Sequence, residues 1–181
     1  TRQWVGVLGL VVMTALAVDR QAALAQDAPL LSTADLFDDS QLHTIALTLH
    51  PRDWEELRAN FMRSTYYPAS LEWHGQRVES VGIRSRGTGS RSDSKPGLRI
   101  DFNRFDEAQR FLGLTAVILR NNIQDASGLN ERIAMKLFAR LGMPAPREAH
   151  VRLSVNGDYA GLYTIVEAID RQFLERHYQQ S

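Results

Sequence analysis

Hydrophobic and polar residues alternate with a period of two in several short runs, the pattern of strands with one buried face. The clearest runs are residues 42–50, the two arms of 66–87, residues 97–102 and the two arms of 150–170. The dipeptides His74-Gly75 and Asn156-Gly157 join the arms, and Asn-Gly is a strong signal for a tight hairpin turn. The segment "TAVILRNN", residues 115–122, is almost continuously apolar and predicts a further strand.

Two segments have the spacing of amphipathic helices. The weaker one, residues 51–61, begins with a proline and carries acidic residues in its first turn. The stronger one, residues 125–142, repeats an apolar side chain every four residues, at Leu129, Ile133, Leu137 and Leu141. The order strand, helix, several strands, helix, two strands predicts an α+β fold, with a mainly antiparallel sheet and helices packed against it.

The beginning of the chain has a different character. Arg2 precedes a run of about fifteen apolar or small residues, and Ala23 and Ala25 form a small-x-small site before Gln26, as in a secretory signal peptide. The run is shorter than the roughly 20 residues of a comfortable membrane span. We expect residues 1–25 to be a cleaved signal peptide, with an uncleaved anchor as the alternative, and residues 26–34 to be a polar leader.

This interpretation places the folded part outside the cytoplasm, in the periplasm, on the cell surface or in the medium, without a stable membrane span once the peptide is cleaved. Basic and acidic residues balance at 21 each, so no overall field favours nucleic acid as a partner. The absence of cysteine excludes disulfides, thiolate metal sites and a cysteine nucleophile. The histidines show no metal-ligand spacing, and we expect no metal site among them.

The stretch "IRSRGTGSRSDSKPGLRIDF", residues 83–102, combines a glycine-rich loop with five basic and two acidic residues. Glycines allow backbone N–H groups to approach phosphate oxygens, and guanidinium or ammonium groups offset the phosphate charge. The alternative is an ordinary turn with solvated arginines, since "GTGS" lacks a third kinase-type glycine and is not a Walker sequence. The order of elements is that of the small lobe of a protein kinase, except that the strand at 115–122 intervenes.

Four stretches resemble the CotH kinase family, the proteins similar to spore coat protein H: "VGIRSRGTGS", "KPGLRIDF", "NNIQDASGLNERIAMKLFARLGMPAP" and "VNGDYAGLYTIVEAIDRQFL". The resemblance covers residues 42–178. It implies a divergent protein-kinase-like fold, of which residues 35–181 form the N-terminal part. It further implies an exported bacterial protein kinase that uses ATP and Mg²⁺ to phosphorylate a protein substrate, which the residues do not identify.

The resemblance also implies nucleotide-binding roles for particular residues: Arg84, Arg86, Gly87, Gly89, Ser90, Lys95, Arg99, Glu131 and Glu167. Gly87, Gly89 and Ser90 form the loop over the phosphates in this interpretation. The two arginines at 84 and 86 lie on the strand that leads into the loop.

The phosphate-contacting cation has two candidates, Lys95 and Arg99, and the residues leave open which of them has this role. Glu131 is expected to orient that cation through an ion pair, or merely to complement the start of its helix. Glu167 is expected near the adenine, or to be a solvated strand end.

The catalytic acid and the Mg²⁺ ligands are expected beyond Ser181, because the chain begins and ends as a piece of a longer protein does. We therefore expect no phosphoryl transfer from this chain alone. Two other functions stay open. One is a non-catalytic envelope or spore-coat-type interaction protein on the same scaffold. The other is a carbohydrate-binding or hydrolase-associated β-rich domain in which Trp54 and Trp73 stack on sugars, although both tryptophans fit core positions better.

Overall fold

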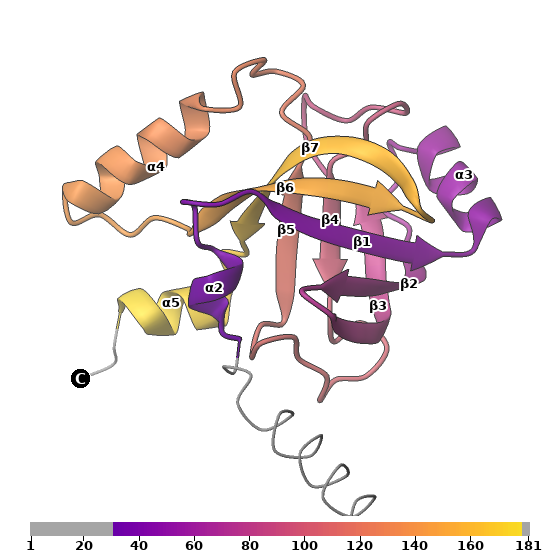
Figure 1. Ribbon diagram of the computed structural model, residues 1–181, viewed down its shortest axis with the longest axis horizontal. Coiled ribbons are helices and arrows are strands. Elements are labelled where there is room, and N and C mark those ends of the chain that lie inside the picture. The colour runs from indigo at the N-terminus through magenta and orange to yellow at the C-terminus, as the bar shows by residue number, and fades with distance from the viewer. Residues whose placement is uncertain (1–30, 179–181) are drawn as a thin grey trace, which may run out of the picture. The chain divides into compact units, whose positions relative to one another are not determined.

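In the computed structural model, which describes residues 31–178, seven strands form one closed barrel in the order β1-β2-β3-β4-β5-β7-β6 (Figure 1). The strands are β1 (His43–Leu49), β2 (Tyr67–Trp73), β3 (Gln76–Ser85), β4 (Leu98–Asp101), β5 (Ala116–Arg120), β6 (Glu148–Val155) and β7 (Asp158–Glu167). Neighbouring strands are antiparallel except β1 and β6, which are parallel and place Ala46 opposite Ser154. This parallel pair closes the barrel.

The alternation of apolar and polar residues along the strands explains which side chains fill the inside of the barrel. Inward side chains from every part of the wall have almost no exposed surface, among them Ile45, Leu71, Ile83, Ile100, Leu119, Leu153 and Ile165. Trp73 is 1% exposed, so it belongs to this core and is not available to stack on a sugar. Both predicted hairpin turns are confirmed, with positive φ at His74, Gly75, Asn156 and Gly157 as a two-residue turn requires.

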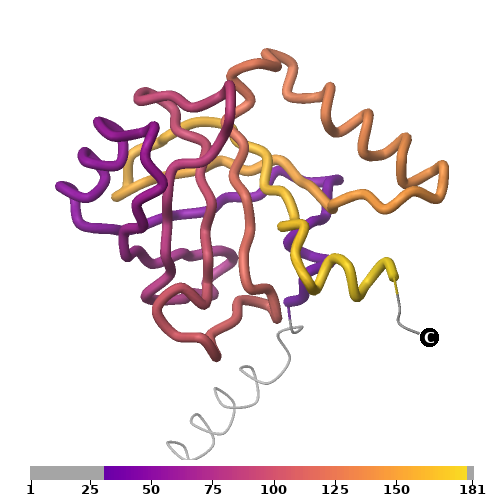
Figure 2. The backbone as a smooth tube through the Cα atoms, turned by 180° about the vertical axis from the view of Figure 1, so that it is seen from behind, coloured from indigo at the N-terminus to yellow at the C-terminus, as the bar shows by residue number. Residues whose placement is uncertain are grey.

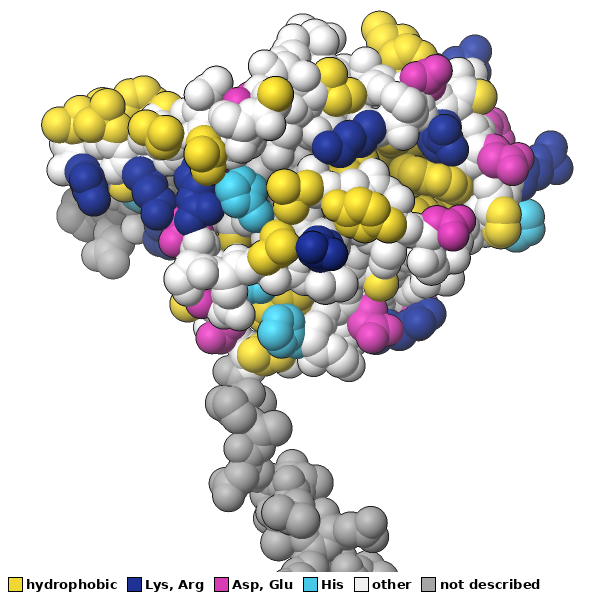
Figure 3. All heavy atoms as spheres, turned by 45° about the horizontal axis from the view of Figure 1, so that its top comes forward, with side chains coloured by type: hydrophobic (Ala, Val, Ile, Leu, Met, Phe, Trp, Pro, Cys, Tyr) yellow, Lys and Arg dark blue, Asp and Glu magenta, His cyan; other side chains and the backbone are white. Residues whose placement is uncertain are grey.

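The described helices are α2 (Thr33–Leu36), α3 (Pro51–Ala59), α4 (Asn130–Arg140) and α5 (Arg171–His177). α2, α3 and α5 each bury one apolar side chain, at Leu36, Leu57 and Phe173. α4 buries none. Figures 1 and 2 show it projecting from one side of the barrel. Its apolar side chains form a stripe on the surface in Figure 3.

The expected α+β fold with helices packed on a sheet, similar to a kinase small lobe, is wrong. The strands close into a mixed barrel that has no sheet edge, and the helices form no covering layer. Sequence periodicity shows which residues of a strand are buried but not which strand lies beside it. The closing contact joins distant parts of the chain: the side-chain oxygen of Asn156 accepts a hydrogen bond from Leu49 N, 107 residues away.

The predicted signal peptide, residues 1–25, lies outside the described residues, as does most of the leader. The last part of the leader enters α2, where Ser32 and Asp35 form a capping box. Among residues 31–178, no helix has the length and apolar character that crossing a membrane requires.

Candidate functional site: a basic pocket on the barrel wall

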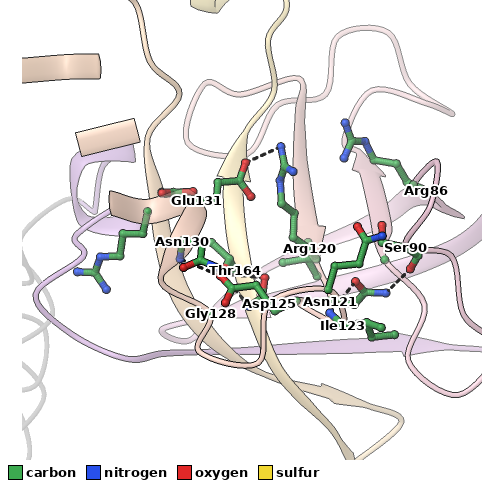
Figure 4. A pocket seen from close by; sticks show the side chains of 17 residues that line it. Arg86, Ser90, Arg120, Asn121, Ile123, Asp125, Gly128, Asn130, Glu131 and Thr164 are labelled. Atoms are coloured by element: carbon green, nitrogen blue, oxygen red, sulfur yellow. Dashed lines mark hydrogen bonds and ion pairs between the residues drawn. The ribbon is translucent and has the colours of Figure 1, made fainter. Parts of the chain in front are cut away.

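A pocket of about 280 Å³ lies beside the glycine-rich loop, between the barrel wall and the start of α4 (Figure 4). Arg86, Gly87 and Ser90 line it from the loop, and Arg120 and Asn121 from the end of β5. The start of α4 and the adjoining strands β6 and β7 complete it with Glu131, Glu148 and Thr164.

The register of the strands gathers arginines on this wall. Arg84 lies opposite Arg99, and Arg99 lies opposite Ile118 of β5. Arg120, two residues after Ile118, points to the same side, because strand side chains alternate. Burial, and then the positive charges of Arg120, Arg99 and Arg84, lower the pKa of Arg86. The other three guanidinium groups are therefore close enough to act on Arg86, and their positive charge favours an anion beside it.

Only part of this positive charge is compensated. Arg99 forms an ion pair with Asp101 at 2.8 Å, and Arg84 donates to the hydroxyl of Tyr66 at 3.0 Å. Arg120 forms an ion pair with Glu131 at 2.8 Å. Within residues 31–178, the Arg86 guanidinium has neither an ion pair nor a hydrogen bond. It is thus free to bind a ligand at the edge of the pocket.

The glycine-rich loop is firmly anchored through its carbonyl groups. Asn121 Nδ2 donates to the carbonyls of Ser90 (2.7 Å) and Lys95 (2.8 Å), and Arg91 Nε donates to that of Gly87 (2.8 Å). In the described part of the chain, no backbone N–H of residues 87–92 donates a hydrogen bond. The carbonyl oxygens of the loop therefore accept hydrogen bonds from the protein itself, and its N–H groups remain available to another partner.

Two glycines of the loop are needed for this conformation. Gly87 has a φ of +133°, a region that side chains rarely adopt. A Cβ at Gly97 would lie 2.8 Å from the carbonyl oxygen of Arg86, which accounts for glycine where β4 approaches the end of β3.

The expected ion pair between Glu131 and Lys95 or Arg99 is wrong. Glu131 pairs with Arg120 instead. Lys95 Nζ donates to the carbonyl of Leu162 at 2.9 Å, away from the pocket, and Arg99 is held by Asp101. Glu131 lies in the first turn of α4, where the carboxylate of Asp125 accepts a hydrogen bond from Asn130 N at 2.8 Å. This contact ties the start of the helix to the preceding loop.

Glu167 lies outside the pocket and is not a solvated strand end. It is 4% exposed and accepts hydrogen bonds from the side chains of Arg147, at 2.8 Å, and Arg176. These contacts tie the end of β7 to the start of β6 and to α5. Of the other predicted residues, Arg86, Gly87, Ser90 and Glu131 line the pocket. Gly89 lies beside it, where its carbonyl accepts from Gln124 at 3.3 Å.

Sequence reasoning missed Arg120, Asn121 and Glu148. Arg120 is the first charged residue after the apolar strand "AVIL", and Asn121 follows it directly. A polar pair at the end of a buried strand is a signal that could have identified both. Glu148 had no such signal, because nothing near "PAPREAH" distinguishes it from a surface glutamate.

The donor set of the pocket fits a phosphate-bearing ligand better than a metal ion. Guanidinium and backbone N–H groups recognise anions. Among residues 31–178, no cluster of three or more histidine, aspartate or glutamate side chains could hold a metal ion.

Fold and pocket together define a closed β-barrel protein with an arginine-rich pocket beside a glycine-rich loop. The chain belongs to the CotH family: the family model described as CotH kinase protein matches residues 83–181, more than half of the chain. The chain is also 24% identical over 139 residues to inner spore coat protein H of Bacillus subtilis (strain 168). That alignment covers 77% of this chain and 37% of the relative. The resemblance found in the sequence is thereby confirmed.

Proposed function

We propose that the basic pocket binds the polyphosphate of ATP, and that the chain is the nucleotide-binding part of a protein kinase that phosphorylates a protein substrate. The observation that carries this proposal is the convergence of Arg86 and Arg120 on a loop with unused backbone N–H groups. The description of the family, CotH kinase protein, supports it. The chain spans only 37% of the length of its relative, so the activity of the whole protein is part of the proposal.

The chemistry of the pocket suits this role. Arg120 is held by Glu131 through one terminal nitrogen, which leaves other N–H groups of its planar fork for phosphate oxygens. Protein kinases likewise hold ATP phosphates with a strand cation that pairs with a helix glutamate. Mg²⁺, if bound with ATP, would neutralise part of the phosphate charge.

We further propose an exported protein that acts at a surface or in a coat-like layer. The secretory pattern of residues 1–25 supports this location, and so does the relative, whose name places it in the inner spore coat. A second candidate function is a non-catalytic interaction protein on the same scaffold. The exposed apolar stripe of α4, with Ile133 62% and Leu141 65% exposed, favours this alternative.

Substitution of the two pocket arginines tests ATP binding. Arg86→Gln and Arg120→Gln should each weaken binding of ATP with Mg²⁺ by roughly 10- to 100-fold, because each removes a charge-assisted hydrogen bond worth about 1.5–3 kcal/mol. Isothermal titration calorimetry measures the dissociation constants.

Arg152→Gln is the matched control, since Arg152 is exposed on β6 and does not line the pocket. Lys95→Gln should also bind ATP like the unmodified chain. Unchanged affinity in both pocket variants would refute the assignment, and no ATP binding by the unmodified chain would favour the interaction protein.

A further inference from the structure

Glu148 is the acidic residue of the pocket wall that the proposed function leaves without a role. We infer that Glu148 is a positioning residue: its ionised carboxylate draws the Arg120 guanidinium towards the barrel wall and so competes with the polyphosphate for it. The inference rests on the proposed function, because it assigns a control of the same binding site.

The carboxylate of Glu148 is buried in an unusual way. The residue is 8% exposed and lines the pocket, yet within residues 31–178 neither of its oxygens has a hydrogen-bond partner. A buried carboxylate without a partner is costly, so such groups normally pair or become protonated. Glu148 therefore needs a donor close by.

Arg120 likewise has a buried polar group without a partner, in this case a donor that needs an acceptor. Its Nε is buried and, in the described part of the chain, also lacks a partner, while one terminal nitrogen holds Glu131. Glu148 of β6 lies opposite Val166 of β7, and Val166 in turn lies opposite Ile118 of β5. Arg120 follows Ile118 on the same face of β5. One strand separates the two residues, and neighbouring strands lie about 4.8 Å apart, a span that the long side chains can bridge.

The other charged and titratable groups around Glu148 come from each element packed against it: Arg120 of β5, Glu131, Arg132 and Lys136 of α4, Asp39 before β1, Arg147 and His150 beside it, and Arg176 and His177 of α5. Arg132 and Lys136 are paired with Asp39, and Arg132 also contacts His150. The two arginines at 147 and 176 are paired with Glu167. Arg147 Nε is also buried and without a partner among the described residues, but Arg147 lines the neighbouring pocket next to α5. Of the arginines that line the basic pocket, Arg120 is the one whose Nε is buried and has no partner in the described part of the chain.

The charge of Glu148 changes in the physiological range. Burial, and then repulsion by Glu131, raise the pKa of Glu148 to about 7. As a neutral acid it releases Arg120 to the phosphates, and as a carboxylate it both attracts Arg120 and repels the ligand. Polyphosphate binding therefore favours the protonated form, and affinity falls as pH rises through about 7.

The first measurement is the affinity for ATP with Mg²⁺ at pH 6 and pH 8, by calorimetry on the 181-residue chain. Glu148→Gln should bind ATP like the unmodified chain at pH 6 and about tenfold tighter at pH 8, since one pH unit of coupling corresponds to a tenfold change. Protonation of ATP itself affects both proteins equally and cancels in their ratio. Glu72→Gln is the matched control, because Glu72 is exposed on β2, away from the pocket.

The second measurement needs no nucleotide. The Glu148 carboxyl is titrated by NMR of ¹³C-labelled glutamate, and Arg120→Gln should raise its midpoint by about one pH unit because a neighbouring positive charge is lost. An unchanged midpoint overturns the inference. It is also overturned if the ratio of the ATP affinity of Glu148→Gln to that of the unmodified chain is the same at pH 6 and pH 8. If the unmodified chain binds no ATP, the proposed function fails, while the NMR titration still decides whether the two residues are paired.

Discussion

Asn121 shows how a single side chain determines the shape of the pocket. It is 3% exposed at the end of β5, and its amide donates to the carbonyls of Ser90 and Lys95 on opposite sides of the glycine-rich loop. The loop is therefore held open as an arch over the end of the strand. The Arg91 side chain adds contacts to Gly87 and to the carbonyls that follow α3.

Removal of this anchor should loosen the loop and lower stability. Asn121→Ala leaves two carbonyls without their donor, so we expect the free energy of unfolding to fall by about 1–3 kcal/mol. Urea denaturation measures the fall, and hydrogen exchange should show faster exchange at the amides of Ser94 and Lys95, which donate hydrogen bonds within the loop. Asn103→Ala is the control, because in the described residues the Asn103 side chain makes no hydrogen bond. Equal stability of the two variants would contradict the anchoring role.

At this scale the sequence indicated the glycine-rich loop and Glu131 but not the partner of Glu131. Lys95 and Arg99 were the nearest cations in the motif, yet a strand residue faces whatever its register places beside it. Arg99 lies next to Asp101 on its own strand and forms an ion pair with it, and Lys95 reaches across to β7. Arg120, from a strand later in the chain, is the residue that the barrel brings to the start of α4.

Among the elements, α4 differs most from its sequence pattern. It lies within the predicted range 125–142 but is shorter, Asn130–Arg140, and its N-cap Leu129 makes no side-chain hydrogen bond. The four-residue repeat also indicated a buried face, but Ile133, Leu137 and Leu141 are more than half exposed. An apolar face requires a covering surface somewhere, and periodicity does not say that the surface belongs to the same described unit.

Substitutions in α4 and in the barrel should therefore have unequal effects. Ile133→Ala should change the free energy of unfolding of the 181-residue chain by no more than about 0.5 kcal/mol, as surface substitutions do. Leu119→Ala, which removes a fully buried side chain from β5, should lower it by about 2–5 kcal/mol. Urea denaturation of both variants gives the comparison. A loss of several kcal/mol in Ile133→Ala would show that α4 packs against the barrel.

For the whole molecule, the buried acid predicts a stability that declines from acidic to neutral pH. Burial and the charge of Glu131 raise the pKa of Glu148 from 4.5 to about 7, so the folded protein keeps a proton that the unfolded chain releases. Between these two values the unfolded state binds fewer protons, and the free energy of unfolding falls by about 1–3 kcal/mol as pH rises. Above about pH 7 the decline ends.

Glu148→Gln should remove this part of the pH dependence. Its melting temperature is expected to exceed that of the unmodified chain at pH 8, with a smaller difference at pH 5. Thermal unfolding followed by circular dichroism across pH 5–8 measures both, and the histidines, common to the two proteins, cancel in the difference. A constant difference at all pH values would show that Glu148 does not titrate in this window.

The strands could be predicted from the sequence, but the architecture they form could not. Alternation at residues such as Ile45 and Leu47, and the positive-φ turns at His74 and Asn156, are properties of neighbouring residues. The barrel depends on a contact that no local pattern reports, the parallel pairing of β1 with β6. Without that contact the same strands make an open sheet, which is the fold that the sequence indicated.

The β1–β6 pairing also bears on how the chain reaches its native state. β1, the first of the described strands, finds its partner β6 only after more than a hundred further residues have been synthesised. Such a high contact order belongs to proteins that fold in milliseconds to seconds, not microseconds. During that interval β1 exposes an unpaired edge, which other chains can join. A nascent chain that stalls before Val155 would thus be the form of this protein most prone to aggregate.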